Sequence, residues 1–378
     1  MTQQLQPGQL LPEDPNGEVG LPGPVFVNAV YDQLPMSETT DQFNTLRGYK
    51  TMHQRTGAGE GIKVGVGDTG VDKTHLEGDL KGCIGKDFTN SRWGYYDRHS
   101  HGSHTTGHIG ARGDGQGFIG LAPNAGLYHA KVLGDSGSGS SRGIANGVQW
   151  LADQGCKIVN LSLGGGFDSY SEGVYRELAQ QGVLIFAAMG NSGFRGGGHP
   201  GTSRYTFGIT AVDYNRRVAS FSSRDKMAKY AGYGVNVLSL VTNGRLARMS
   251  GTSMACPDQA GVCANILSYM LKLGLPLPNS MEEYESIVKD SLEDLGNAGH
   301  DTSYGDGFIH LDDVLAKLDT MAPPQEPEPP TEPTPPEETG TLGMGIALSS
   351  SGLIVFANAG EDATLKVGNK TFNGKAIM

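Results

Sequence analysis

The chain contains little of what marks several other classes of protein. It has two tryptophans and four cysteines in 378 residues, and its net charge is −11. Without clustered Lys and Arg, this charge disfavours a nucleic-acid partner. No apolar stretch reaches the length of a membrane-spanning helix, so we expect no membrane partner. The cysteines lack the spacing of a zinc site and the density of a disulfide scaffold, and we expect free, mostly buried thiols at Cys83, Cys156, Cys256 and Cys263.

The first twenty residues, MTQQLQPGQLLPEDPNGEVG, lack the basic start and apolar run of a secretory signal. We therefore expect a cytoplasmic or particle-associated protein, or a secreted one whose signal is not in this sequence. Glycine, in contrast, is abundant: the 58 glycines are about twice the usual share. This content favours an enzyme rich in tight turns and close backbone approaches over a helical bundle.

From Ile62 onward, short apolar runs alternate with helical patterns, which predicts βαβ units and a parallel sheet buried on both faces. Helices are expected over 142–154, before Gly155, and over 172–181, before Gly182. Right-handed crossovers would place helices on both sides of the sheet, giving an α/β fold of three layers. The expected strands cover 62–66, 127–132, 157–163, 183–188 and 207–212.

The composition divides the chain into four parts. Residues 1–44 are rich in Pro, Gly and acidic residues, and we expect an extended segment that packs on the following domain or lies across its cleft. Residues 45–320 form the main domain, and 321–342 form a stiff Pro/Glu-rich linker. The tail, 343–378, predicts two or three short strands, too few to be stable unless they pair with a partner or a second copy.

Three short segments carry chemistry: VGVGDTGVD, HSHGSHTTGH and SGTSMACPDQAG. They supply a carboxylate at Asp68, an imidazole at His101 and a hydroxyl at Ser253. A serine hydroxyl becomes a strong nucleophile when a base takes its proton and a carboxylate orients that base. Ser253 follows a glycine turn that opens a long apolar helix, and the N–H groups and dipole of a helix start favour an oxyanion beside the nucleophile.

Each motif alone has other interpretations. Asp-Thr-Gly also marks aspartic proteases, but these need two such carboxylates, and the single copy here would require a symmetric dimer. His101, His104 and His108 share a helical face and could bind a metal, although neither Cys nor Glu is spaced to complete a zinc site. Asp68 and Ser253 could be simple turn and cap residues. The three segments together favour catalysis.

With their order of Asp, His and Ser, these segments make the chain resemble the subtilisin-like serine proteases, the subtilase family, from about Gly48 to about Leu318. The resemblance implies a serine endopeptidase that forms an acyl-enzyme on a mainly parallel sheet flanked by helices. It assigns the oxyanion hole to Asn191, in FAAMGNSG, and to the Ser253 N–H, and it makes His104 and His108 structural. Subtilases often carry an inhibitory prodomain, and residues 1–44 are too few to fold as one.

The resemblance also implies a cleft for extended peptides. Three small residues line a pocket that would accept a large apolar side chain before the scissile bond, and Ser192 replaces the acidic residue of many relatives. A cis peptide bond is expected in the turn His199-Pro200-Gly201. The residues that the resemblance assigns to substrate are Gly137, Ser138 and Gly139 on one edge, Ser162, Leu163 and Gly164 on the other, and Ala188, Gly190 and Gly198 in the pocket.

Calcium is the one cofactor that the resemblance suggests, and no organic cofactor is expected. The loop ARGDGQGFIGLAP has the length of the family's calcium loop, although a solvated glycine turn is the competing interpretation. The candidate ligands are the side chain of Asp114, the carbonyls of Arg112, Gln116 and Phe118, and Glu77 or Asp79. A different class of function also stays open: a protease-like binding or scaffold protein whose cleft residues 1–44 block, or which never matures.

Overall fold

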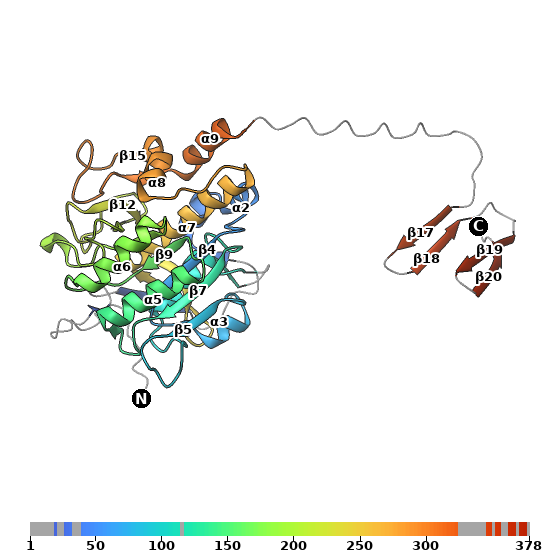
Figure 1. Ribbon diagram of the computed structural model, residues 1–378, viewed down its shortest axis with the longest axis horizontal. Helices are drawn as coiled ribbons and strands as arrows, with labels where there is room; N and C mark the ends of the chain where they lie inside the picture. The colour runs from blue at the N-terminus through green and yellow to red at the C-terminus, as the bar shows by residue number, and fades with distance from the viewer. Residues whose placement is uncertain are drawn as a thin grey trace. The chain divides into compact units, whose positions relative to one another are not determined.

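The computed structural model describes residues 39–113 and 117–323, and it gives the backbone of six further strands. The chain divides into two compact units, 1–323 and 324–378 (Figure 1). Within the described helices, none combines the length and the apolar character that crossing a bilayer requires. The six further strands are β1 (Val19–Gly20), β2 (Phe26–Tyr31), β17 (Gly345–Ser349), β18 (Gly352–Phe356), β19 (Asp362–Val367) and β20 (Lys370–Lys375).

A nine-stranded sheet forms the middle of the first unit, in the order β15-β16-β12-β11-β10-β9-β4-β7-β5. Every neighbouring pair is parallel except β15 with β16. Each of the five expected strands is present, so the predicted α/β fold is confirmed. The sheet comprises β4 (Lys63–Asp68), β5 (Ile84–Asp87), β7 (Gly126–Lys131), β9 (Ile158–Leu161), β10 (Leu184–Ala188), β11 (Phe207–Val212), β12 (Ala228–Tyr233), β15 (Leu292–Glu293) and β16 (Phe308–Ile309).

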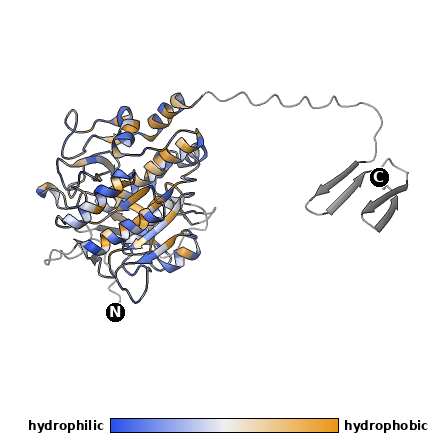
Figure 2. Ribbon diagram, viewed as in Figure 1, coloured by the Kyte–Doolittle hydropathy of each residue, from blue (hydrophilic) through white to orange (hydrophobic). Residues whose placement is uncertain are grey.

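Helices cover both faces of this sheet. The two expected helices are α5 (Ser141–Asp153) and α6 (Ser169–Gln180), and the side chains of Ser140 and Asp168 cap their first turns. In Figure 2 the helices of this unit change between orange and blue along their length, as amphipathic helices do. The other helices are α1 (Gln42–Leu46), α2 (Tyr49–Thr56), α3 (Lys73–Glu77), α4 (His101–Gly110), α7 (Thr252–Lys272), α8 (Met281–Val288), α9 (Leu311–Met321) and the 3-10 helices η1 (Gly193–Arg195) and η2 (Lys289–Ser291).

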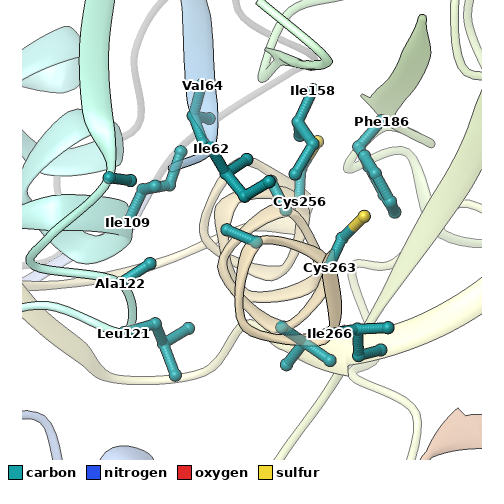
Figure 3. Close-up of a cluster of buried hydrophobic side chains, with 14 of the residues drawn as sticks. Ile62, Val64, Ile109, Leu121, Ala122, Ile158, Phe186, Cys256, Cys263 and Ile266 are labelled. Atoms are coloured by element: carbon teal, nitrogen blue, oxygen red, sulfur yellow. The ribbon is translucent and has the colours of Figure 1, made fainter. Parts of the chain in front are cut away.

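Apolar cores lie on both faces of the sheet, because alternate strand residues point to opposite sides. On β9 and β10, Val159 and Ile185 face the core beneath α5 and α6, whereas Ile158 and Phe186 face the core around α7. Figure 3 shows α7 surrounded by apolar side chains, with Cys263 pointing toward Phe186. All four cysteines are buried and free, as expected.

The N-terminal part packs on this domain. β1 pairs antiparallel with β8 (Ser138–Gly139), with Val19 opposite Gly139 and Gly20 opposite Ser138. β2 completes a three-stranded sheet with β13 (Val237–Val241) and β14 (Arg245–Ser250), and β3 (Thr39–Thr40) pairs with β6 (Phe118–Ile119). Asp41, Phe43 and Asn44 are fully buried, so the last residues of the expected extended segment contribute to the core.

The second unit contains two antiparallel hairpins, β17 with β18 and β19 with β20. The tail therefore has four strands where two or three were expected. The Pro/Glu-rich linker lies outside the described residues, apart from its first three positions.

Candidate active site

Asp68 ends β4 at the carboxyl edge of the sheet, where α/β folds gather their sites. Its carboxylate accepts hydrogen bonds from His101 Nδ1 at 2.8 and 3.0 Å and from the Thr105 hydroxyl at 3.0 Å. Burial raises the pKa of Asp68, but the His101 charge and its hydrogen bond outweigh it, so the pKa lies below its ordinary value. The carboxylate is therefore ionised and holds the imidazole in one orientation.

His101 is the first residue of α4 and is buried. Because a carboxylate only accepts, the ring proton is on Nδ1, and in the neutral ring Nε2 is an acceptor. Among the described residues, Nε2 of His101 has no hydrogen-bond partner. The structure thus joins Asp68 with His101 and leaves a buried basic nitrogen on the opposite side of the ring.

Ser253 is the second residue of α7, a helix that packs against α4. Its hydroxyl donates to the Ser162 carbonyl at a long 3.4 Å, so the hydroxyl is not bonded to His101 in this structure. The Ser162 hydroxyl in turn donates to the Ser253 carbonyl at 2.8 Å. As the second helical residue, Ser253 has no carbonyl acceptor for its own N–H within the helix.

Asn191 follows β10, beside the start of α7. Its Oδ1 accepts from the Thr252 N–H at 2.8 Å and from the Thr252 hydroxyl at 3.0 Å. The Thr252 hydroxyl is also within 3.1 Å of the Gly190 N–H, which donates to it. These contacts fix the plane of the Asn191 amide one residue before Ser253.

The residues expected to bind substrate lie on segments that neighbour this site. Ser162, Leu163 and Gly164 follow β9, and Gly165 forms an isolated bridge with His199. A Cβ built on Gly198 would lie 3.4 to 3.9 Å from Gly164 and Gly165, so the two segments face one another at van der Waals distance. The His199-Pro200 bond is cis, as predicted. The other expected edge, at residues 137–139, contains β8, which is paired with β1.

The two other histidines of α4, His104 and His108, are also fully buried. His104 Nε2 lies 3.1 Å from the Val237 carbonyl and 3.2 Å from the Ala247 carbonyl, and burial lowers the pKa of His104 to about 3. His108 Nε2 lies 3.8 Å from Asp258 Oδ1. Across 39–113 and 117–323, no group of three or more His, Cys, Asp or Glu side chains is placed to hold a metal ion.

The calcium candidates are only partly described. Asp79 is buried, and its carboxylate accepts from the Phe118 N–H at 3.1 Å. Its carbonyl accepts from the Arg112 N–H at 2.8 Å, so Asp79 contacts the expected loop at Arg112 and at Phe118. Glu77 is exposed at the end of α3. Asp114 and Gln116 lie outside the described residues. A buried carboxylate at this loop fits a calcium ion as one ligand of a larger set.

Sequence reasoning missed two residues that hold the site together. Asp97 Oδ1 accepts from the Thr69 hydroxyl at 3.0 Å, and Oδ2 accepts from the Ser103 hydroxyl at 2.7 Å. His129 lies in β7 and is completely buried. A signal for His129 was present, because a histidine inside the apolar run of a central strand needs hydrogen-bond partners.

The geometry defines a class of protein: an α/β protein in which a buried carboxylate holds an imidazole, with a serine at the start of a helix that packs against the helix of the histidine. The profile of the Subtilase family matches residues 59–307. The chain is 34% identical to subtilisin DY of Bacillus licheniformis over 67% of this chain and 90% of that protein. It is 34% identical to subtilisin Savinase of Lederbergia lenta over 69% of this chain and 93% of that protein. The chain belongs to the subtilase family and is a subtilisin-like serine endopeptidase.

Proposed function

We propose that the protein cleaves peptide bonds with Ser253 as nucleophile, His101 as general base and Asp68 as the carboxylate that stabilises the imidazolium. The observation that carries this assignment is the buried Asp68–His101 pair, in which Nε2 of His101 has no hydrogen-bond partner among the described residues. Ser253 would give up its long bond to Ser162 and turn its hydroxyl toward this nitrogen. A bond of 3.4 Å is at the weak limit of hydrogen bonding, so the rotation costs little.

The reaction then follows in two stages. Ser253 Oγ attacks the scissile carbonyl carbon as His101 Nε2 takes its proton, and the Asn191 amide and the Ser253 N–H donate to the oxyanion. His101 passes the proton to the leaving amine as the C–N bond breaks and the acyl-enzyme forms. Water, deprotonated by His101, releases the acid and restores Ser253.

For the residue before the scissile bond, P1, we propose a preference for large apolar side chains. The pocket residues Ala188, Gly190 and Gly198 add no bulk, and Ser192 brings no negative charge. We expect peptides with Phe or Leu at P1 to be cleaved at least tenfold faster than peptides with Lys or Arg, measured as kcat/KM on a matched peptide series. Equal rates would contradict this specificity and leave the catalytic assignment intact.

The rival function, an inactive protease-like scaffold, has one observation in its favour: β1 occupies the edge strand β8 that substrate would use. A fluorophosphonate probe separates the two functions. We expect it to label Ser253 in a chain that begins at residue 25, and not in the same chain with S253A. A folded, trimmed chain that stays unlabelled would support the scaffold.

For the calcium site, we propose Asp79 as a side-chain ligand together with Asp114 and the carbonyls of Arg112, Gln116 and Phe118. Bound calcium would tie residues near α3 to the loop that follows α4. Chelation should lower the Tm by several degrees, and added calcium should restore it. A D79N variant should have a Tm that does not respond to chelator, and a response equal to that of the wild type would reject Asp79.

A further inference from the structure

Two side chains of β7 hold the turn that carries Asp68. Lys131 Nζ donates to the Thr69 carbonyl at 2.5 Å, and the Gly70 N–H donates to His129 Nε2 at 3.0 Å. His129 and Lys131 are two residues apart on the strand, so they point to the same side, and they lie opposite Val66 and Asp68 of β4. The backbone directly after Asp68 is therefore anchored on the neighbouring strand.

The contacts of His129 define its chemical state. A backbone N–H can only donate, so Nε2 must be unprotonated to accept from Gly70. The ring proton is then on Nδ1, which lies 3.0 Å from the Thr106 hydroxyl of α4. Both nitrogens are used, and the residue is fully buried between β4 and α4. His129 is thus a neutral imidazole with one defined tautomer.

The charged groups around His129 come from each element that packs against it. Burial lowers the pKa of His129 to about 4, while Asp68 on β4 and Asp97 before α4 raise it and Lys131 on β7 lowers it. The balance keeps the His129 ring neutral at pH values above about 4, where the Asp68 carboxylate is ionised. The acceptor for Gly70 is therefore present throughout that range.

We propose that His129 is a positioning residue for the reaction: it fixes Gly70, and through the turn 68–70 it sets the orientation of the Asp68 carboxylate toward His101. This proposal rests on the catalytic assignment made above. The turn has little other freedom, because Gly70 has φ +116° and the Thr69 N–H donates to Asp68 Oδ1 at 2.7 Å. Without an acceptor the buried Gly70 N–H would be unsatisfied, and the turn would shift to satisfy it.

Three substitutions of His129 separate this role from simple packing. In H129Q the glutamine Oε1 lies about as far from the backbone as Nε2 of the histidine, so it can accept from the Gly70 N–H. In H129N the amide is too short to reach Gly70 but can still meet Thr106, and H129L can do neither. We expect H129Q to keep kcat within about threefold of wild type, and H129N and H129L to lose tenfold or more in kcat with KM changed less than twofold.

The NMR resonance of the His101 Nδ1 proton gives a second readout that a packing defect away from the site would not move. This proton is donated to Asp68 over 2.8 Å, and its chemical shift depends on the geometry of that hydrogen bond. The resonance should therefore move in H129N and keep its wild-type position in H129Q. If H129L does not fold, the comparison of H129N with H129Q still tests the proposed role of His129.

Two results would overturn the proposal. One is a folded H129N with the wild-type kcat and the wild-type resonance of the His101 Nδ1 proton, and the other is a folded H129Q as impaired as H129N. Failure of the catalytic assignment itself is recognised separately, because the wild-type chain starting at residue 25 would then show neither probe labelling nor peptide hydrolysis.

Discussion

The amide oxygen of Asn191 accepts hydrogen bonds from Thr252, and this orients the amide nitrogen as a hydrogen-bond donor. Thr252 donates twice to Oδ1, so the –NH2 end of the amide is turned to the opposite side of the same plane. If that end stabilises the oxyanion, N191L should lose roughly 10²–10³ in kcat with little change in KM, because the donor acts in the transition state.

The control for this prediction is T252V, which keeps the Asn191 donor and removes one of its two anchors. We expect steady-state kinetics to show a loss of about tenfold or less for T252V. An N191L variant with wild-type kcat would remove Asn191 from the oxyanion hole.

Buried histidines make the stability of the fold depend on pH. Burial lowers the pKa of His104 to about 3 and that of His129 to about 4, whereas an unfolded histidine titrates near 6.5. Below pH 6.5 the unfolded chain therefore binds protons that the folded chain does not. The contribution of these two neutral histidines to the stability of the fold is complete above pH 6.5, and it is lost progressively as the pH falls toward 3 to 4.

From these pKa values, each histidine should remove about 2 kcal/mol from the free energy of unfolding between pH 7 and pH 5. Urea unfolding at the two pH values measures the loss. H129Q, which cannot titrate, should show a smaller loss than wild type by about that amount. Identical pH dependence in wild type and H129Q would mean that the pKa of His129 is the same in the folded and unfolded states.

At the scale of elements, an ion pair joins the N-terminal helices to the helix of the nucleophile. Arg47, which directly follows α1, binds Asp258 on α7 through two hydrogen bonds of 2.8 and 3.0 Å. The Asp258 side chain is fully buried, and the Arg47 side chain is 10% exposed. Removing one partner from such a pair leaves an uncompensated buried charge.

We therefore expect R47A to lower the free energy of unfolding by about 3–5 kcal/mol in urea titrations. The matched control is R55A, because Arg55 pairs with Asp319 at the surface. The Arg55 side chain is 34% exposed, and the Asp319 side chain is 47% exposed. That exposed pair should contribute less than about 1 kcal/mol. Equal losses in R47A and R55A would show that the buried pair is not what holds α1 on the domain.

The sequence predicted the elements that have strong local patterns. The five expected strands are short, mainly apolar runs, and α5 and α6 have clear apolar stripes that follow capping residues. β12, with the sequence AKYAGY, and β16, with two residues, lack such a pattern and become strands only because the sheet offers them a partner. The N-terminal strands β1 and β2 likewise depend on distant partners, at residues 138–139 and 245–250.

The candidate site divides in the same way. Asp68, His101 and Ser253 stand in short motifs that can be found along the chain. Asp97 and His129 contact the turn 68–70 from 28 and 59 residues away, and no local pattern records such contacts. The rotamer of Ser253, directed to Ser162, is also a tertiary property, because it depends on the segment after β9.

At the scale of the whole molecule, the sheet order explains why the three segments meet. The chain starts the sheet in the middle with β4, adds β7 and β5 on one side, and then crosses to β9 on the other. The carboxyl end of β4 is thus a topological switch point, where α/β folds form their crevice. His101 at the start of α4 is hydrogen-bonded to Asp68 at the end of β4, and Ser253 at the start of α7 is hydrogen-bonded to Ser162, which follows the neighbouring strand β9. Figure 1 shows β4, β9 and α7 in the same unit.

The second unit suggests association between copies of the chain. Each of its two hairpins has only two strands, a size that is marginally stable alone, and the sequence of β18, GLIVF, has four consecutive apolar residues. We expect the full chain to form concentration-dependent oligomers at micromolar concentration in analytical ultracentrifugation, and a chain ending at residue 323 to be monomeric. Because residues 1–323 form a compact unit, the shorter chain should keep its Tm within about 2 °C and its kcat/KM within twofold. A full chain that stays monomeric across that range would exclude self-association and point to a different protein as the partner of the hairpins.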